Sequence, residues 1–161
     1  MNTKIAIQGI KGAFHEEVAL HCFGNDIEIV PCITFKELID NVVARHVEKA
    51  VMAIENTISG TMHENLELIR MNGLEIIGEL PWKIHQNLCV VPGTSIDMLT
   101  EIHSHHMALK QCRSYFDNYP EIKLVETEDT ALSIKNVAEN ANMSIGALGS
   151  KHAAQLYGLE I

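Results

Sequence analysis

Short apolar segments alternate with amphipathic segments along most of the chain. Residues 4–8 have the composition of a β-strand, and residues 14–23 place apolar side chains at helical spacing before Gly24. The continuous apolar run at residues 50–54 is typical of a strand that is buried on both faces. Further strands are predicted at 26–30, 74–80, 88–91, 102–104, 122–125 and 143–148, and helices at 34–45, 62–71, 107–116, 131–140 and 151–157. This alternation predicts an α/β fold with parallel sheets.

Two local features add detail to this prediction. Thr34 is placed to cap the helix that follows it, and Glu37 is placed for the reciprocal capping bond. Residues 74–91 contain two neighbouring extended runs with no helix between them, which indicates a passage between two α/β lobes. We therefore predict a first lobe at residues 1–80 and a second lobe at residues 81–161.

Composition and charge limit the classes of partner. The chain has 161 residues, of which 47% are apolar and 20% charged, so it is long and apolar enough to fold around a core. Its formal net charge is −9 and it has no basic block, so neither nucleic acid nor an anionic membrane is an expected partner. A small anion would have to be bound by local hydrogen-bond donors, because the overall charge repels it.

No segment of the sequence predicts export or membrane insertion. The N-terminal apolar stretch is too short for a secretory signal and ends at Gly9, and no run approaches the roughly 18–20 apolar residues of a membrane helix. The cysteines are scattered, which predicts reduced thiols and a cytoplasmic protein. They are Cys22, Cys32, Cys89 and Cys112.

Three loops that follow predicted strands are candidate sites, because ligands of α/β folds bind beyond the carboxyl ends of the strands. The loop from Gly9 to Gly12 is either an anion cradle at a helix N-terminus or a structural turn. The polar segment at 54–61 is either a site or a loop that caps the next helix. In the third loop, at 103–106, Ser104 is placed to cap the following helix.

Other chemistries have weaker support in the sequence. A metal site would use His103 and His105, joined by His85 or His152, but no HExxH motif or cysteine pair supports it. The chain lacks a G-x-S-x-G motif, a dinucleotide-binding G-x-G-x-x-G and a Walker A motif.

Four short motifs occur in order along the chain. They are Gly9-x-x-Gly12-Ala13-Phe14, Ile54-Glu55-Asn56-Thr57-x-x-Gly60, Ser104-His105-x-x-Ala108-Leu109-x-Gln111-Cys112 and Ala153-Ala154-x-x-Tyr157-Gly158-Leu159. In this combination the chain resembles the prephenate dehydratase family from Lys4 to Ile161. The resemblance implies two α/β lobes with a cleft between them, similar to type II periplasmic binding proteins. It also implies a lyase of phenylalanine biosynthesis that converts prephenate to phenylpyruvate, without metal or organic cofactor, as a homodimer or homotetramer.

The resemblance also assigns roles to residues. Asn56 and Thr57 match the family's Asn-Ser/Thr pair, and Ser104 and Gln111 match its serine and glutamine ligands. Glu55 is a candidate for holding the loop or assisting proton transfer. The expected substrate-binding residues are Gly9, Gly12, Ala13, Phe14, Gly60, His105 and Ala108, and a histidine that is common on a lobe-connecting strand corresponds to His85.

The chain departs from the family pattern at three places. His15 stands where a serine is usual, and His106-Met107 replaces a Pro-Gln pair. The family's Thr-Arg-Phe segment is missing, and with the regulatory ACT domain it is expected beyond Ile161, which implies a fragment of a longer product with little activity of its own. Two other functions remain open, an arogenate dehydratase and a non-catalytic module that binds aromatic carboxylates.

Overall fold

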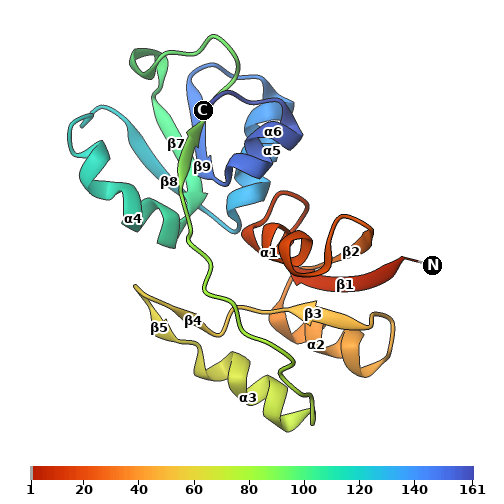
Figure 1. The fold of residues 1–161 in the computed structure, drawn as a ribbon. Helices are drawn as coiled ribbons and strands as arrows, with labels where there is room; N and C mark the ends of the chain where they lie inside the picture. Colours follow the sequence, from red (N-terminus) through yellow and green to blue (C-terminus); the bar gives the residue numbers. More distant parts are fainter. Residues whose placement is uncertain (1) are drawn as a thin grey trace. The chain divides into compact units, whose positions relative to one another are not determined.

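The computed structural model describes residues 2–161, and the chain divides into two compact units, Met1–Lys83 and Ile84–Ile161. The division falls after Lys83, whereas the sequence places the boundary after residue 80. Each unit contains a β-sheet with helices packed on it (Figure 1). The predicted α/β class with two lobes is therefore confirmed.

The first unit is built on a three-stranded parallel sheet in the order β2-β1-β3. Alternate residues of β1 face opposite sides, so Ile5 and Ile7 pack with Ala19 of α1, whereas Ala6 packs with Leu38 of α2. A two-stranded hairpin, β4-β5, follows the sheet. The elements are β1 (Thr3–Gln8), α1 (Phe14–Phe23), β2 (Ile27–Cys32), α2 (Phe35–Val43), β3 (Lys49–Val51), β4 (Glu55–Asn56), β5 (Gly60–Thr61) and α3 (His63–Met71).

The second unit is built on a four-stranded sheet in the order β6-β9-β7-β8. β7 runs parallel to both β8 and β9, and β6 runs antiparallel to β9. The elements are β6 (Asn87–Cys89), the 3-10 helix η1 (Ile96–Met98), β7 (Glu101–His105), α4 (His106–Phe116), β8 (Lys123–Thr127), α5 (Thr130–Asn140), β9 (Ile145–Gly149) and α6 (Lys151–Tyr157).

Helices cover both faces of this second sheet. Ile102 and Leu148 pack in one cluster with Leu109 of α4, whereas Ala147 packs in another with Ile134 of α5. Successive residues of β9 thus enter different cores, as the pleat of a strand requires. One consequence is that β7 lies inside the sheet and presents its carboxyl end directly to α4.

Two predicted strands differ from the observed structure. No strand forms at residues 74–80, where side chains such as Ile77 are exposed. β3 is a three-residue strand at the edge of its sheet, paired only with β1. Residues 50–54 are half-buried, and residues 52–54 lie beyond the end of the strand. An apolar run has the same appearance in an edge strand and a central one, so the sequence overstates its burial.

The start of α2 confirms part of the predicted capping. The Thr34 Oγ1 accepts a hydrogen bond from the Glu37 N–H across 3.1 Å, as expected for an N-cap. The Glu37 carboxylate instead accepts from the Ile33 N–H, one residue before the cap. The helix ends at Val43, because Arg45 has a φ of 59°, outside the helical region.

Within residues 2–161, no helix has both the length and the apolar character that a bilayer crossing requires.

Candidate active site

The first predicted loop joins β1 to α1, and three N–H groups at this turn already have partners. The Gly9 N–H donates to the Cys32 carbonyl, the Gly12 N–H to the Glu16 carboxylate and the Ala13 N–H to the Ile10 carbonyl. Gly12 has a φ of 95°, a conformation that glycine adopts more easily than other residues, which explains why a glycine occupies this position. Of the two interpretations of this loop, the geometry favours the structural turn, because the protein's own carboxylate lies where an anion would bind.

No motif in the sequence identifies Glu16, although it is buried and its carboxylate holds this turn. Its spacing of four residues from Gly12 is the available signal, since a carboxylate in the first turn of a helix can reach back to a preceding N–H. Ala13 is buried at the N-cap of α1, and Phe14, the first residue of the helix, is half-buried.

His15, which replaces the family's serine, is a neutral imidazole. Burial lowers its pKa to about 4, and a hydrogen bond with the Gln8 backbone opposes this shift. The ring lies edge-on to Phe35, with 5.7 Å between ring centroids. His15 therefore adds no positive charge to this end of the sheet at neutral pH.

The second predicted loop is the β4-β5 hairpin, and Asn56 organises it. Its Oδ1 accepts hydrogen bonds from the Ile58 N–H (2.9 Å) and the Ser59 N–H (3.4 Å). Gly60, with a φ of 80°, closes the turn opposite Asn56. Because the oxygen is occupied, the Nδ2 group is left as a donor, and it has no acceptor among residues 2–161.

The neighbours of Asn56 reach solvent. Glu55 is exposed on β4, and Thr57 is exposed in the turn, so both side chains are accessible to a ligand. Thr57, Asn56 and Glu55 are therefore together on one short hairpin, as their adjacency in sequence requires. The interpretation of this segment as a mere cap of α3 is weakened, because the N-cap Met62 has no side-chain capping bond.

The third predicted loop has a different geometry from the one expected. Ser104 is the fourth residue of β7, fully buried, and its Oγ donates to the Leu148 carbonyl of β9 across 2.8 Å. The prediction that Ser104 caps α4 is wrong, because the strand continues one residue further. His105 is the N-cap instead, and its Nδ1 accepts from the Met107 N–H.

The hydrogen bond from the Met107 N–H determines which ring nitrogen of His105 carries the proton. Since Nδ1 accepts, the proton of the neutral ring is on Nε2, which makes Nε2 a donor. Burial, and then the neighbouring His106, lower the pKa of His105, whereas Asp129 and Glu126 raise it. The half-buried His105 is therefore neutral at pH 7 and can donate one hydrogen bond.

Gln111 lies on α4 and is half-buried, while Ala108, one turn earlier, is fully buried. The Gln111 Oε1 accepts from the Nε2 of Gln86, which precedes β6, across 3.3 Å. Its own Nε2 group has no acceptor among the described residues, so Gln111, like Asn56, has an occupied oxygen and an available N–H donor. No motif in the sequence identifies Gln86, and His85 beside it is exposed.

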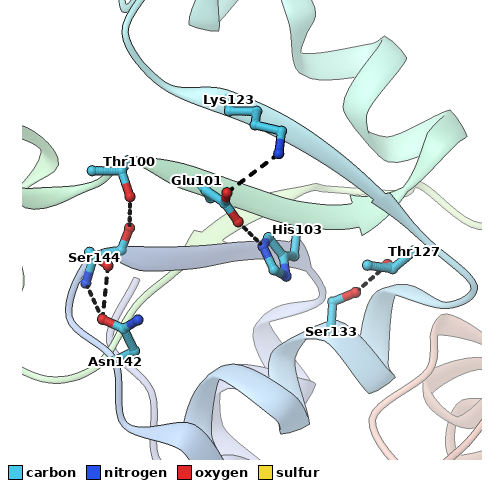
Figure 2. Close-up of polar contacts among 8 residues, drawn as sticks. All are labelled: Thr100, Glu101, His103, Lys123, Thr127, Ser133, Asn142 and Ser144. Carbon is cyan, nitrogen blue, oxygen red and sulfur yellow. Dashed lines mark hydrogen bonds and ion pairs between the residues drawn. The ribbon is translucent and has the colours of Figure 1, made fainter.

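The histidines of β7 do not form a metal site. His103 and His105 share one face of the strand, but His103 Nε2 lies 2.8 Å from the Glu101 carboxylate (Figure 2). Lys123 of β8 lies 3.6 Å from the other oxygen of Glu101. Residues 2–161 contain no group of three or more histidine, cysteine, aspartate or glutamate side chains placed to hold a metal ion.

The four cysteines are free, as predicted from their spacing. Burial raises the pKa of Cys112, next to Gln111, and raises that of Cys89 to about 12. Both are therefore thiols rather than thiolates at neutral pH, and neither is an activated nucleophile.

Comparison with known proteins identifies the family. A family model described as prephenate dehydratase matches residues 5–161. The chain belongs to the prephenate dehydratase family. A curated relative, the chloroplastic arogenate dehydratase/prephenate dehydratase 1 of Arabidopsis thaliana, is 35% identical over 158 residues, which cover 98% of this chain and 40% of the relative. The chain thus spans about 40% of the length of this curated member of the prephenate dehydratase family.

Two solved structures are similar to this chain over nearly its whole length. The prephenate dehydratase of Arthrobacter aurescens, solved in complex with L-Phe, has a TM-score of 0.86 and 25% identity, over 96% of this chain and 52% of that chain. A protein described as GqqA, a novel type of quorum quenching acylase, has a TM-score of 0.86 and 31% identity, over 98% of this chain and 57% of that one. The same fold thus occurs in solved proteins that carry two different descriptions.

Proposed function

We propose that the protein catalyses the decarboxylative dehydration of prephenate to phenylpyruvate. The observation that carries this proposal is the family match over residues 5–161, together with two amide side chains whose N–H donors are available. Asn56 and Gln111 are each proposed to donate a hydrogen bond to a carboxylate of the substrate.

The reaction needs little covalent chemistry from the protein. The bond between the ring and its carboxylate breaks, its electron pair enters the ring, and the hydroxyl at the opposite ring carbon leaves. One proton is taken up by that hydroxyl, so prephenate and a proton give phenylpyruvate, carbon dioxide and water. Because the ring becomes aromatic, the protein mainly has to orient the substrate and stabilise the charge that develops.

Uncharged donors are suited to this protein and to this substrate. Prephenate carries two carboxylates, and a chain of net charge −9 repels it at long range. When the oxygen of a side-chain amide already accepts a hydrogen bond, the amide presents its NH₂ group rather than its oxygen to the anion. Such an amide can bind a carboxylate without a lysine or arginine. His105 would add a third neutral donor through its Nε2.

The proton for the leaving hydroxyl is proposed to come by way of the exposed hairpin. Glu55 and Thr57 flank Asn56 and both reach solvent, so a proton could be passed between water, the carboxyl group and the threonine hydroxyl. Ser104 is proposed to act indirectly rather than by contact with the substrate, because its buried hydroxyl donates to the Leu148 carbonyl.

Two alternatives concern the substrate and the reaction. The name of the relative from Arabidopsis thaliana includes arogenate dehydratase, and arogenate differs from prephenate by an amino group in place of a keto oxygen. A chain that binds aromatic carboxylates without converting them is the other alternative. Ultraviolet detection of phenylpyruvate from prephenate, and of phenylalanine from arogenate, separates all three outcomes on the full-length protein.

The cellular setting and assembly are part of the proposal. Free, scattered cysteines support a reducing compartment such as the cytoplasm. Exposed apolar side chains in the first unit, among them Ile33 and Met71, support a homodimer or homotetramer. Light scattering on the purified protein would determine the oligomeric state.

A further inference from the structure

Gln86 is the neighbour of Gln111 that the sequence does not single out. Its Nε2 donates to the Gln111 Oε1, and the two residues are 25 positions apart, so no local motif links them. Gln86 is half-buried just before β6, whereas Gln111 is on the second turn of α4. The contact therefore exists only because β6 and α4 belong to the same folded unit.

The contact decides which end of the Gln111 amide is available. A primary amide has an oxygen that accepts and an NH₂ group that donates. With its oxygen held by Gln86, Gln111 directs its NH₂ hydrogens elsewhere, and no acceptor for them occurs among residues 2–161. A carboxylate can be bound by that NH₂ group, whereas the amide oxygen would repel it.

We propose that Gln86 is a positioning residue, which holds the Gln111 amide in the orientation that donates to a substrate carboxylate. This inference rests on the proposed function, in which Gln111 contacts prephenate. Without the Gln86 N–H, the Gln111 amide can turn about its last side-chain bond and present its oxygen, so a fraction of the protein is unable to bind the substrate productively.

A second observation separates this role from simple packing. The Gln86 Oε1 is buried and has no hydrogen-bond partner in the described part of the chain. A buried acceptor without a partner costs free energy, so Gln86 is a poor choice for stability at this position. An apolar side chain of similar size should be tolerated there, and the protein should be as stable or more stable with it.

The test is a double-mutant cycle on the full-length protein with prephenate as substrate. We expect Gln86→Leu to raise KM about 3- to 10-fold with little change in kcat, because the substrate loses a donor that binds it. The thermal midpoint should stay the same or rise. In the Gln111→Leu background, Gln86→Leu should have no further effect on KM, because the amide that it orients is gone.

A third variant keeps the shape of the side chain and changes only its hydrogen bonding. Gln86→Glu has the same length but an ionised carboxylate that cannot donate, so it should raise KM at least as much as Gln86→Leu. Multiplicative effects of the Gln86 and Gln111 variants, or a lower thermal midpoint with unchanged KM, would contradict the positioning role. A folded parent protein that neither binds nor converts prephenate would overturn the proposed function itself, and this inference with it.

Discussion

The β4-β5 hairpin of the first unit and the junction of β7 with α4 in the second unit hold their motif residues in opposite ways. Asn56 is held by hydrogen bonds to Ile58 and Ser59, two and three residues away, in a segment whose other side chains reach solvent. Ser104 is fully buried and bonds to Leu148, 44 residues away, in the neighbouring strand. One region is organised locally and the other by the core of its unit.

This difference shows that matching a family motif does not give two residues the same role. The Asn56 amide has an available donor and little connection to the core, so its substitution should affect function more than stability. The Ser104 hydroxyl donates a hydrogen bond within the sheet, so its substitution should mainly lower stability. Any effect on function should arise because α4, which follows β7, changes position. The variants below test this distinction, from the largest expected effect to the smallest.

Ser104→Val should lower the free energy of unfolding by about 2–3 kcal/mol, because it removes a buried hydrogen bond and adds a methyl group to a filled core. Chemical denaturation measures the change. Ser59→Val in the exposed hairpin is the matched control and should change stability by less than about 0.5 kcal/mol. Equal effects of the two valines would contradict the contrast between the regions.

His15 should make the stability of the first unit depend on pH. The folded imidazole has a pKa of about 4 and an unfolded one about 6.5, so between these values the unfolded chain binds a proton that the folded chain does not. Stability should therefore fall as the pH falls from 7 to 5, by on the order of 2 kcal/mol from this residue. His15→Ser should flatten the denaturation profile over this range; an unchanged slope would show that His15 is not buried as a neutral ring.

Asn56→Asp separates the role of the side-chain NH₂ donor from the role of the side-chain oxygen in the turn. Aspartate keeps an oxygen for the Ile58 and Ser59 N–H groups, so the hairpin and the thermal midpoint should be unchanged. The NH₂ donor is lost and a negative charge is added, so kcat/KM for prephenate should fall at least tenfold, or about 1.4 kcal/mol. The neutral variant Asn56→Ala should also lose about tenfold.

The control for Asn56 is Asn118→Ala, which removes an exposed asparagine that hydrogen-bonds the Tyr115 carbonyl. It should leave kcat/KM unchanged. Wild-type rates in both Asn56 variants would remove Asn56 from the site.

Substitutions near the N-terminal end of β7, around Glu101, should have the smallest effect. Lys123 is exposed and lies 3.6 Å from Glu101, whose pKa is lowered first by His103 and then by Lys123 (Figure 2). Exposed ion pairs contribute little, so Lys123→Met should leave both the thermal midpoint and the rate unchanged within error. A large loss of activity would show that this end of the strand takes part in function.

Local sequence patterns predict much of this structure. The boundaries of α1 and the N-cap at Thr34 agree with the sequence, because helical spacing and capping depend on residues within one or two turns. The short β4-β5 hairpin and the absence of a strand at residues 74–80 were not predicted, because pairing depends on distant partners. The same limit applies to the contacts of Ser104 with Leu148 and of Gln86 with Gln111.

Conversion of prephenate by the full-length protein tests the central claim most directly. We predict stoichiometric release of carbon dioxide and phenylpyruvate, with the Asn56→Asp variant at least tenfold slower in kcat/KM at unchanged thermal stability. Tight binding of prephenate with no product, or no binding by a folded protein, would contradict a dehydratase whose substrate is held by uncharged donors.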